Sequence, residues 1–383
     1  LNPGGTENDH VWEQGEPFED VGLDGVKNTP QQANGGYDVG EGDGKFTLST
    51  GAQKIYQYDP HSFLHGRTTP PGGPVDAAAL RRLNIWADGG VRDMANFAAV
   101  ANHLVGAVAS VKDTDGSQVQ PTAFYNNFEN LPGCDPTQPN QFLAVNVLWN
   151  DVPRAAHMRY GYVDATDSMI AEGDGQHVGT GSQAVYRLVT GFYFAASAWP
   201  DADRTVSDTL IQDPTDPDFN GETTTKNVQG TACELSGKCN TYFTGPKTGR
   251  TGPIGVVLPP GYALEANRAR DVRYPVLYML HGYGQDPRDL EATAAVTNNY
   301  MNDSQRSSAT RLAKMIVVYV DGRCRIDPTT NAPECIRGTF YVDSDRQVNG
   351  HAVGQLDDWF EEVMTYVDQN YRTMPATDVD VVE

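Results

Sequence analysis

The pattern of apolar and polar positions in the first half of the chain predicts alternating strands and helices. Residues 83–87 (LNIWA) form a short apolar run that ends in Asp-Gly-Gly, which predicts a strand followed by a turn. Residues 91–111 and 183–198 carry apolar side chains at a spacing of about 3.6 residues, which predicts two helices. The apolar run at residues 142–149 (FLAVNVLW) predicts a second buried strand. Strands that alternate with helices indicate an α/β layer.

The second half of the chain repeats this alternation with longer apolar runs. Residues 252–262 predict a strand followed by a Pro/Gly turn. Residues 275–280 (PVLYML) are continuously apolar, as expected for a strand buried on both faces of a sheet. Residues 315–324 contain another apolar run, which ends in Asp-Gly, and residues 356–371 have the single apolar face of an amphipathic helix.

Changes in composition divide the chain into four parts. Residues 1–50 are acidic, rich in Gly and Asp, and too poor in apolar residues to bury a core alone. Residues 51–205 hold the first α/β layer. Residues 206–251 are rich in Asp, Thr, Pro and Gly, as in a linker or a long surface excursion. Residues 252–383 hold the second sheet, so the expected fold class is α/β with two such domains behind an acidic segment.

A few polar residues of the first layer are candidates for binding. Asp88 and Asp93 flank the predicted strand-to-helix turn, a place where ligands often bind in open α/β sheets. His157, Asp174 and His177 lie in polar stretches. We expect these three to be capping or hydrogen-bonded residues of loops.

The chain is strongly acidic, with 28 Lys and Arg against 50 Asp and Glu and a net charge of −22. Such a surface repels nucleic-acid phosphates and anionic lipid headgroups, so neither is an expected partner. The sequence has no run of about 18 apolar residues that would span a membrane. It begins at Leu1 without an initiator Met or a signal peptide. We therefore expect a secreted, extracellular or cell-surface protein whose leader has been removed.

Acidic residues and glycines alternate at short intervals in the first 50 residues. Ca²⁺ takes about six to eight oxygen ligands, and glycines let the backbone turn sharply enough to bring carboxylates together. The stretches DVGLDG and DVGEGDG are therefore candidate calcium loops, although they lack the EF-hand spacing. A solvated acidic leader is the alternative interpretation. The candidate Ca²⁺ ligands are Glu16, Asp20, Asp24, Asp38, Glu41 and Asp43.

The five cysteines favour an oxidising compartment. Cys233 and Cys239 are close in sequence, as are Cys324 and Cys335, and both pairs lie in turn-rich stretches that a short disulfide can pin. Cys134 is left over, either as a free thiol or with a partner beyond residue 383. No pair has the C-x-x-C spacing, so a zinc site is not expected.

The apolar run at 275–280 continues into His281-Gly282-Tyr283-Gly284. A strand that runs into an HG-x-G turn is how α/β-hydrolases place a backbone N–H for the oxyanion hole. Small residues are needed there because the backbone itself must approach the developing negative charge. This turn is the most informative motif in the sequence.

Several motifs that follow one another in residues 252–383 resemble the esterase D-like family of α/β-hydrolases. They are LPPGY, YPVLYMLHGYGQ, the strand ending in VDG, TFYVDS and the helix ending in VDQNYR. The family includes feruloyl and acetyl-xylan esterases, S-formylglutathione hydrolases and mycolyltransferases. The resemblance covers about a third of the chain and implies the N-terminal half of an α/β-hydrolase domain.

The resemblance assigns roles to few residues. Tyr283 or Gly284 matches the position that supplies an oxyanion-hole N–H, and His281 matches the histidine that orders this loop and is not the general base. Asp321, Tyr341 and Asp343 match positions near the substrate cleft, with loop ordering as the alternative role.

The resemblance does not supply a nucleophile within this sequence. The family's serine lies in a G-x-S-x-G elbow, and its acid and histidine follow later. No serine here has Gly both two positions before and two positions after it. Residues 378–383 (DVDVVE) would lead into the strand before that elbow. We therefore expect the N-terminal part of a secreted serine esterase, whose open sheet edge is covered by the C-terminal half of the domain or by another chain.

Two other functions fit the sequence. One is a non-catalytic, calcium-stabilised extracellular assembly or binding protein that reuses an esterase scaffold and self-associates. The other is a polysaccharide-associated module that presents some of the 18 Tyr and 5 Trp residues to sugars, although core packing accounts for most such residues.

Overall fold

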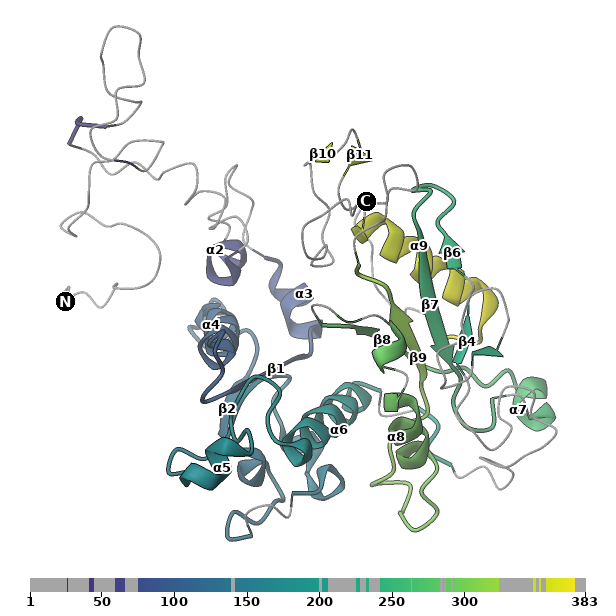
Figure 1. Cartoon of the computed structure of the whole chain (residues 1–383), viewed down its shortest axis with the longest axis horizontal. Helices are drawn as coiled ribbons and strands as arrows, with labels where there is room; N and C mark the ends of the chain where they lie inside the picture. Colours follow the sequence, from purple (N-terminus) through teal and green to yellow (C-terminus); the bar gives the residue numbers. More distant parts are fainter. Residues whose placement is uncertain are drawn as a thin grey trace, which may run out of the picture. The chain divides into compact units, whose positions relative to one another are not determined.

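The computed structural model divides the chain into two compact units, Leu1–Gly191 and Phe192–Glu383 (Figure 1). Both units are mixed α/β, as the sequence predicts. The described residues are 26, 41–44, 59–65, 75–138, 142–199, 202–205, 225–227, 232–233, 242–262, 264–282, 285, 287–290, 292–323, 347–348, 351–352 and 356–375.

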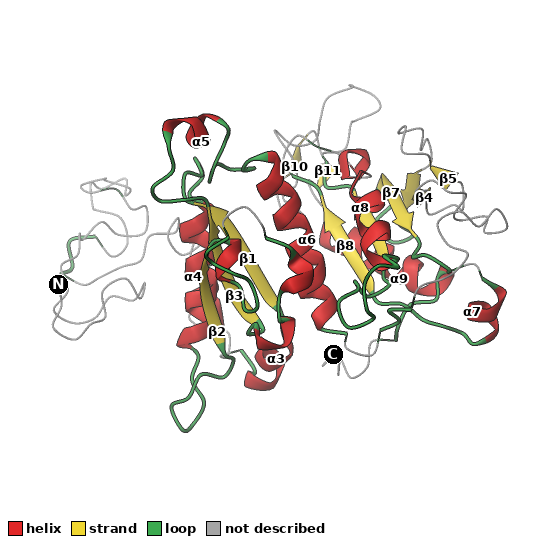
Figure 2. Cartoon of the chain, turned by 90° about the horizontal axis from the view of Figure 1, so that it is seen from below, coloured by secondary structure: helices red, strands yellow, loops and turns green. Residues whose placement is uncertain are grey.

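Unit 1 is built on a three-stranded parallel sheet with the order β1-β3-β2. Figure 2 shows helix α4 lying alongside these strands. The unit contains, in chain order, α2 (Pro60–Leu64), α3 (Ala77–Arg82), β1 (Ile85–Gly90), α4 (Phe97–Ser110), β2 (Thr122–Asn126), β3 (Ala155–Tyr160), α5 (Asp167–Ala171) and the first part of α6 (Gly181–Ser197).

Strand β1 and helix α4 pack closely together at Gly89, where the backbones leave no room for a side chain. An added Cβ on Gly89 would lie 2.2 Å from the backbone nitrogen of Ala98, at the start of α4. Residues 91–96, predicted as helix, form turns instead, because Asn96 has a left-handed backbone and the Asp93 carboxylate accepts the Ala95 N–H at 2.7 Å. The predicted helix over 183–198 is confirmed as α6.

The strand predicted at residues 142–149 is wrong. Two short 3₁₀ turns occupy the segment, Ala144–Asn146 and Trp149–Asp151, and Trp149 Nε1 donates to the Ala144 carbonyl at 2.9 Å. Four of its apolar side chains are nevertheless buried. A short apolar run therefore predicted burial correctly but not backbone conformation. The central strand of the sheet is β3, whose sequence AAHMRY mixes apolar and charged residues.

Unit 2 is built on a six-stranded mixed sheet with the order β5-β4-β7-β9-β8, to which β6 adds by pairing with β7. Strands β8 and β9 are parallel, and β7 is antiparallel to β9. The unit contains β4 (Thr225–Asn227), β5 (Ala232–Cys233), β6 (Tyr242–Thr244), β7 (Thr251–Val257), α7 (Glu265–Ala269), β8 (Val276–Leu280), a 3₁₀ helix (Pro287–Leu290), α8 (Ala292–Met301), β9 (Ile316–Val320), β10 (Gln347–Val348), β11 (His351–Ala352) and α9 (Leu356–Asn370).

Helices cover both faces of the unit 2 sheet. On one face, Val318 of β9 packs in a buried cluster with Trp359 and Val363 of α9. On the other face, the Tyr319 hydroxyl lies 2.8 Å from Thr293 Oγ1 of α8. The predicted strands at 252–262, 275–280 and 315–324 and the helix at 356–371 are confirmed as β7, β8, β9 and α9. The stretch predicted as a linker contributes β4, β5 and β6 to the sheet.

Among the strands that the structure describes, β8 lies at one edge of this sheet, and the expectation that it is buried on both faces is not met. Its residues are only partly buried and Leu280 is 45% exposed, whereas β9 beside it is fully buried. Just before β8, Tyr274 forms a parallel bridge with Thr373: its N–H donates to the Arg372 carbonyl at 2.9 Å and its carbonyl accepts the Met374 N–H at 2.8 Å. The chain after α9 therefore runs beside the start of β8.

In the described part of the chain, no helix has the length and apolar character needed to cross a membrane.

Candidate functional site

The candidate site lies where two parallel strands of unit 2 end. The register pairs Leu280, the last residue of β8, with Val320, the last residue of β9. His281 and Asp321 therefore follow directly at the same edge of the sheet. Both side chains are buried. Carboxyl ends of parallel strands are where open α/β sheets usually place their functional residues.

The His281 imidazole ties the two strand ends together. Its Nε2 accepts the Gly322 N–H at 2.9 Å, and its Nδ1 donates to the Gly282 carbonyl at 2.9 Å. The neutral ring with its proton on Nδ1 satisfies both contacts. Nε2 also lies 3.5 Å from Asp321 Oδ1, but with no proton on Nε2 this is a close approach and not a hydrogen bond. The ring therefore links the residue that follows β8 to the second residue after β9.

The Asp321 carboxylate is held mainly by Arg323. Arg323 Nε donates to Asp321 Oδ1 at 2.7 Å, and the Arg323 N–H donates to the same oxygen at 3.2 Å. Burial alone would raise the pKa of Asp321, but hydrogen bonds and the nearby guanidinium outweigh burial and lower it. We assign this lowering to Arg323, because the proton of His281 is on the other ring nitrogen. Asp321 is therefore ionised and is bonded to Arg323, two residues further along the chain.

The buried side chain of Arg250 contacts the residues that follow β9. Arg250 Nη2 donates to the Arg323 carbonyl at 2.6 Å, and the guanidinium lies 5.3 Å from the centre of the Trp359 ring. An added Cβ on Gly252 would be 3.2 Å from both Asp321 Oδ2 and Trp359, so a larger residue there would press on the carboxylate and the indole. Sequence reasoning did not find Arg250, because nothing in its local pattern distinguishes a buried arginine from a surface one.

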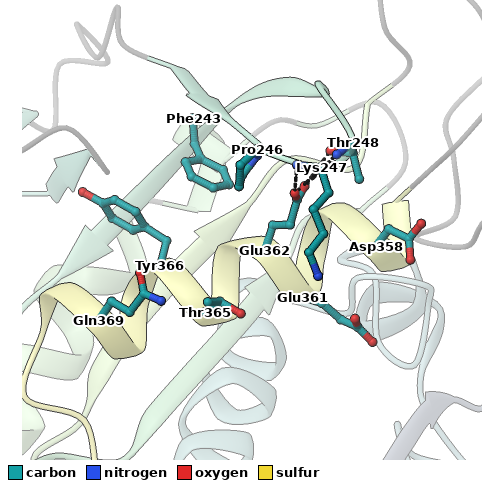
Figure 3. A pocket seen from close by; sticks show the side chains of 10 residues that line it. All are labelled: Phe243, Pro246, Lys247, Thr248, Asp358, Glu361, Glu362, Thr365, Tyr366 and Gln369. Atoms are coloured by element: carbon teal, nitrogen blue, oxygen red, sulfur yellow. Dashed lines mark hydrogen bonds between the residues drawn. The ribbon is translucent and has the colours of Figure 1, made fainter.

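A groove of about 360 Å³ lies between helix α9 and the turn that joins β6 to β7 (Figure 3). At its wall, the buried Glu362 carboxylate accepts hydrogen bonds from the Lys247 N–H, from Thr248 Oγ1 at 2.6 Å and more weakly from the Thr248 N–H. Phe243 and Tyr366 form one end of the groove, and the exposed Asp358 and Glu361 lie on its rim. Glu362 thus fastens the turn to the helix and is not available as a reactive carboxylate.

The equivalent edge of unit 1 carries ion pairs. Buried Asp174 accepts from Arg92 Nη1 at 3.0 Å and from the Tyr162 N–H at 2.9 Å. Asp88 and Asp93, the two acids expected at this turn, pair with Arg187 at 2.7 Å and with His177 Nδ1 at 3.0 Å. The expectation that Asp174 and His177 are hydrogen-bonded loop residues is confirmed. The carboxylates of Asp88, Asp93 and Asp174 are therefore each bonded to a side chain of unit 1.

His157 is the exception among the polar residues expected in loops of unit 1. It lies in the middle of β3, is 2% exposed, and neither ring nitrogen has a hydrogen-bond partner among the described residues. Its ring packs edge-on against Phe124 at 4.9 Å. Burial, and secondarily the charge of Arg159, lowers the pKa of His157, so the ring is neutral.

A second cavity, of about 280 Å³, opens at the carboxyl ends of β2 and β3 in unit 1. Polar side chains dominate its lining, among them Asn126, Asn127, Glu129, Arg159 and Tyr162. Sequence reasoning missed this cavity because β2 and β3 were not predicted as strands.

Most of the other predicted site residues lie outside the described part of the chain. This holds for Tyr283, Gly284, Tyr341 and Asp343, for the strand expected at 378–383, for Cys239, Cys324 and Cys335, and for Glu16, Asp20, Asp24 and Asp38. Glu41 and Asp43 are described, in a bend where Gly42 and Gly44 have positive φ. The described residues include no group of three or more potential metal ligands.

Cys134 is a free thiol in the described structure. Burial raises the pKa of this thiol to about 11, and the charge of Glu129 adds to the shift.

The chain matches no protein-family model and no curated protein.

Proposed function

We propose that unit 2 is the N-terminal part of a serine esterase of the α/β-hydrolase type, in which the loop after β8 supplies a backbone N–H to the oxyanion hole. The observation that carries this proposal is the tethering of His281, whose two ring nitrogens bond to Gly282 and Gly322 at the ends of two parallel strands. An oxyanion hole stabilises the transition state only if its donors are held in place before the reaction. The imidazole provides such a hold at the start of the loop.

The reaction in this proposal is ester hydrolysis through an acyl-enzyme. A serine attacks the ester carbonyl, the alcohol leaves, and water then releases the acid. The N–H of Tyr283 or Gly284 stabilises the tetrahedral oxyanion in both steps. His281 and Asp321 are positioning residues here, because their hydrogen bonds go to the backbone and to Arg323.

The proposal requires a nucleophilic serine outside residues 1–383, since no serine in this sequence lies in a G-x-S-x-G elbow. The bridge between Tyr274 and Thr373 supports such an arrangement. The Pro275 carbonyl accepts the Ile316 N–H on the β9 side, whereas the N–H and carbonyl of Tyr274 face the chain that follows α9. That chain thus runs along the edge of the sheet to which a further strand would add.

The test is active-site labelling of the protein extended beyond residue 383 by its own continuing sequence. We expect hydrolysis of p-nitrophenyl acetate and labelling by a fluorophosphonate probe at one serine after residue 383. Mass spectrometry of the labelled peptide identifies that serine. A label on a serine within residues 1–383, or an extended protein that neither hydrolyses the ester nor takes the label, would contradict the proposal.

The role of His281 is tested in the same extended protein. His281→Ala should lower kcat by about 10- to 100-fold, because the loop that carries the oxyanion donor loses its hold. His177→Ala in unit 1 is the matched control, since His177 is also a histidine beside an aspartate, and it should leave kcat unchanged. Equal losses in the two variants would mean that His281 has no special relation to the reaction.

A further inference from the structure

The cavity at the carboxyl ends of β2 and β3 in unit 1 is a candidate for a second ligand-binding site. It has a volume of about 280 Å³ and shares no residue with the site described in unit 2. Ligands of open α/β sheets usually bind outside the carboxyl ends of parallel strands, in concave sites with a few convergent polar groups. The identity of those polar groups decides which ligand fits.

The cationic group of the cavity is Arg159, at the end of β3. Its Nη2 donates to Asn126 Oδ1 at 2.7 Å, and its guanidinium lies 5.9 Å from the centre of the Phe124 ring. Among the residues that the structure describes, no carboxylate lies within ion-pair distance of Arg159. The other N–H groups of its guanidinium make no hydrogen bond with these residues. The guanidinium is therefore fixed in orientation and retains donors for a ligand.

The acceptors of the cavity come from the loop after β2. Buried Glu129 accepts the Tyr162 hydroxyl at 2.6 Å, which fixes its carboxylate. Asn127, also buried, has a φ of 79°, and its N–H donates to the Arg159 carbonyl at 2.7 Å. A left-handed backbone at a residue other than glycine is held only where its surroundings enforce it. The polar groups of this loop are thus fixed in place before a ligand arrives.

The charges of the cavity favour a neutral ligand over a strongly charged one. An anion would meet the carboxylates of Glu129 and Asp164, and a cation would meet the guanidinium of Arg159. Amide, guanidinium and carboxylate groups together supply both donors and acceptors. A hydroxyl group donates and accepts at once, so a ligand with several hydroxyls satisfies both kinds of group.

We propose that this cavity binds a neutral, polyhydroxylated ligand of monosaccharide size. The proposal does not rest on the esterase function of unit 2, and the two can fail separately.

The test is a binding screen of the full chain by saturation-transfer NMR, followed by isothermal titration calorimetry. The probes are the neutral sugars xylose, arabinose, glucose, galactose and mannose, with glucuronate and glucosamine as the anionic and cationic counterparts. We expect at least one neutral sugar to bind with millimolar or better affinity, and to bind more tightly than either charged sugar.

Matched variants locate the binding. Arg159→Lys removes the planar guanidinium but keeps the positive charge. Asn130→Ala removes the exposed amide of a residue that lines the cavity. Each variant should weaken the affinity for the sugar by about tenfold or more. Arg154→Lys, at the opposite end of β3, and Asn102→Ala, on the exposed face of α4, should leave the affinity unchanged.

Three results would overturn the proposal. One is the absence of binding by every neutral sugar. Another is a charged sugar that binds more tightly than all of the neutral ones. The third is a neutral sugar whose affinity is the same in Arg159→Lys and Asn130→Ala as in the unchanged protein.

Discussion

Each unit contains a buried histidine in or directly after one of a pair of parallel strands, and the two rings differ in their hydrogen bonds. His281 in unit 2 makes a hydrogen bond with each ring nitrogen, at 2.9 Å in both cases. His157 in unit 1 makes none with the described residues, although it is the more buried of the two. One imidazole links two strand ends, whereas the other fills space between β3 and its neighbours.

The two histidines indicate that burial alone does not determine how much a polar side chain contributes to stability. A hydrogen-bonded group stabilises its surroundings, and removing it leaves its partners without theirs. An unbonded group costs free energy to bury, and an apolar side chain of similar shape can replace it at no loss. The bonding of each histidine, and not its burial, therefore predicts what substitution does. Four substitutions or changes of pH test this rule.

The largest effect is expected for His281→Leu. The change leaves the buried Gly322 N–H without a partner, at a cost of about 1–3 kcal/mol, and removes the bond to the carbonyl of the exposed Gly282, worth about 0.5–1.5 kcal/mol. The free energy of unfolding, measured by urea denaturation, should fall by about 2–4 kcal/mol. His281→Gln, whose amide can both donate and accept, should recover part of this loss. If the leucine variant is as stable as the unchanged protein, the two hydrogen bonds do not hold the loop.

The next effect extends the comparison to a carboxylate. Glu362→Ala leaves the Lys247 N–H and the Thr248 hydroxyl without their acceptor, so we expect a loss of about 2 kcal/mol in urea denaturation. Glu362→Gln keeps one acceptor oxygen and should lose less. Glu361→Ala, at the neighbouring exposed position, is the control and should change the stability by less than about 0.5 kcal/mol. A glutamine variant as unstable as the alanine variant would show that the second oxygen or the charge carries the effect.

Acid should weaken the pairing around Asp321. Because the pKa of this carboxyl is lower in the folded protein than its ordinary value of 3.8, its contribution is present above that value and is lost as the pH falls below it. We expect about 1 kcal/mol, reduced by the partial exposure of Arg323. The measurement is urea denaturation of the unchanged protein and of Asp321→Asn between pH 7 and pH 3. The stability gap between them should narrow toward pH 3; a constant gap would contradict the assignment.

The smallest effect at neutral pH is expected for His157→Leu. The free energy of unfolding should change by less than about 1 kcal/mol at pH 8, because no hydrogen bond is lost. The pKa of His157 is lower in the folded protein than its ordinary value of 6.5, so the unfolded chain takes up a proton first. The unchanged protein therefore loses stability as the pH falls below 6.5, and the leucine variant should lose less. Parallel pH profiles would show that the folded state accommodates a charged His157.

The sequence predicted the elements of unit 2 better than those of unit 1, for a physical reason. Strand β9 is buried on both faces and α9 on one, and these patterns are legible in residues 315–324 and 356–371. Strand β3 was missed because the buried His157 and the partly buried Arg159 interrupt its apolar run. The 142–149 run was assigned to a strand because burial without periodicity does not distinguish a strand from tight turns.

The sites follow the same division. His281 and Asp321 were predicted from the HGYG and VDG motifs that carry the resemblance, and the structure brings the two residues together at one sheet edge. Their partners were not predictable, since Arg250 and Gly252 come from a distant strand and only the fold brings them near. The same holds for the cavity of unit 1, whose lining comes from separate loops. The Ca²⁺ ligands and the disulfides in residues outside the described part stay predictions.

The bridge between Tyr274 and Thr373 has a consequence for how the protein folds during synthesis. Close by, the Arg372 N–H donates to the Tyr262 hydroxyl, across a sequence separation of 110 residues. Contacts of such long range form late, because the entropy of closing the intervening loop must be overcome first. The backbone of Tyr274, just before β8, therefore emerges from the ribosome before its partner and stays unpaired until the chain after α9 has been made. During that interval unit 2 exposes a strand edge on which other nascent chains can pair, so chaperone binding should be concentrated there.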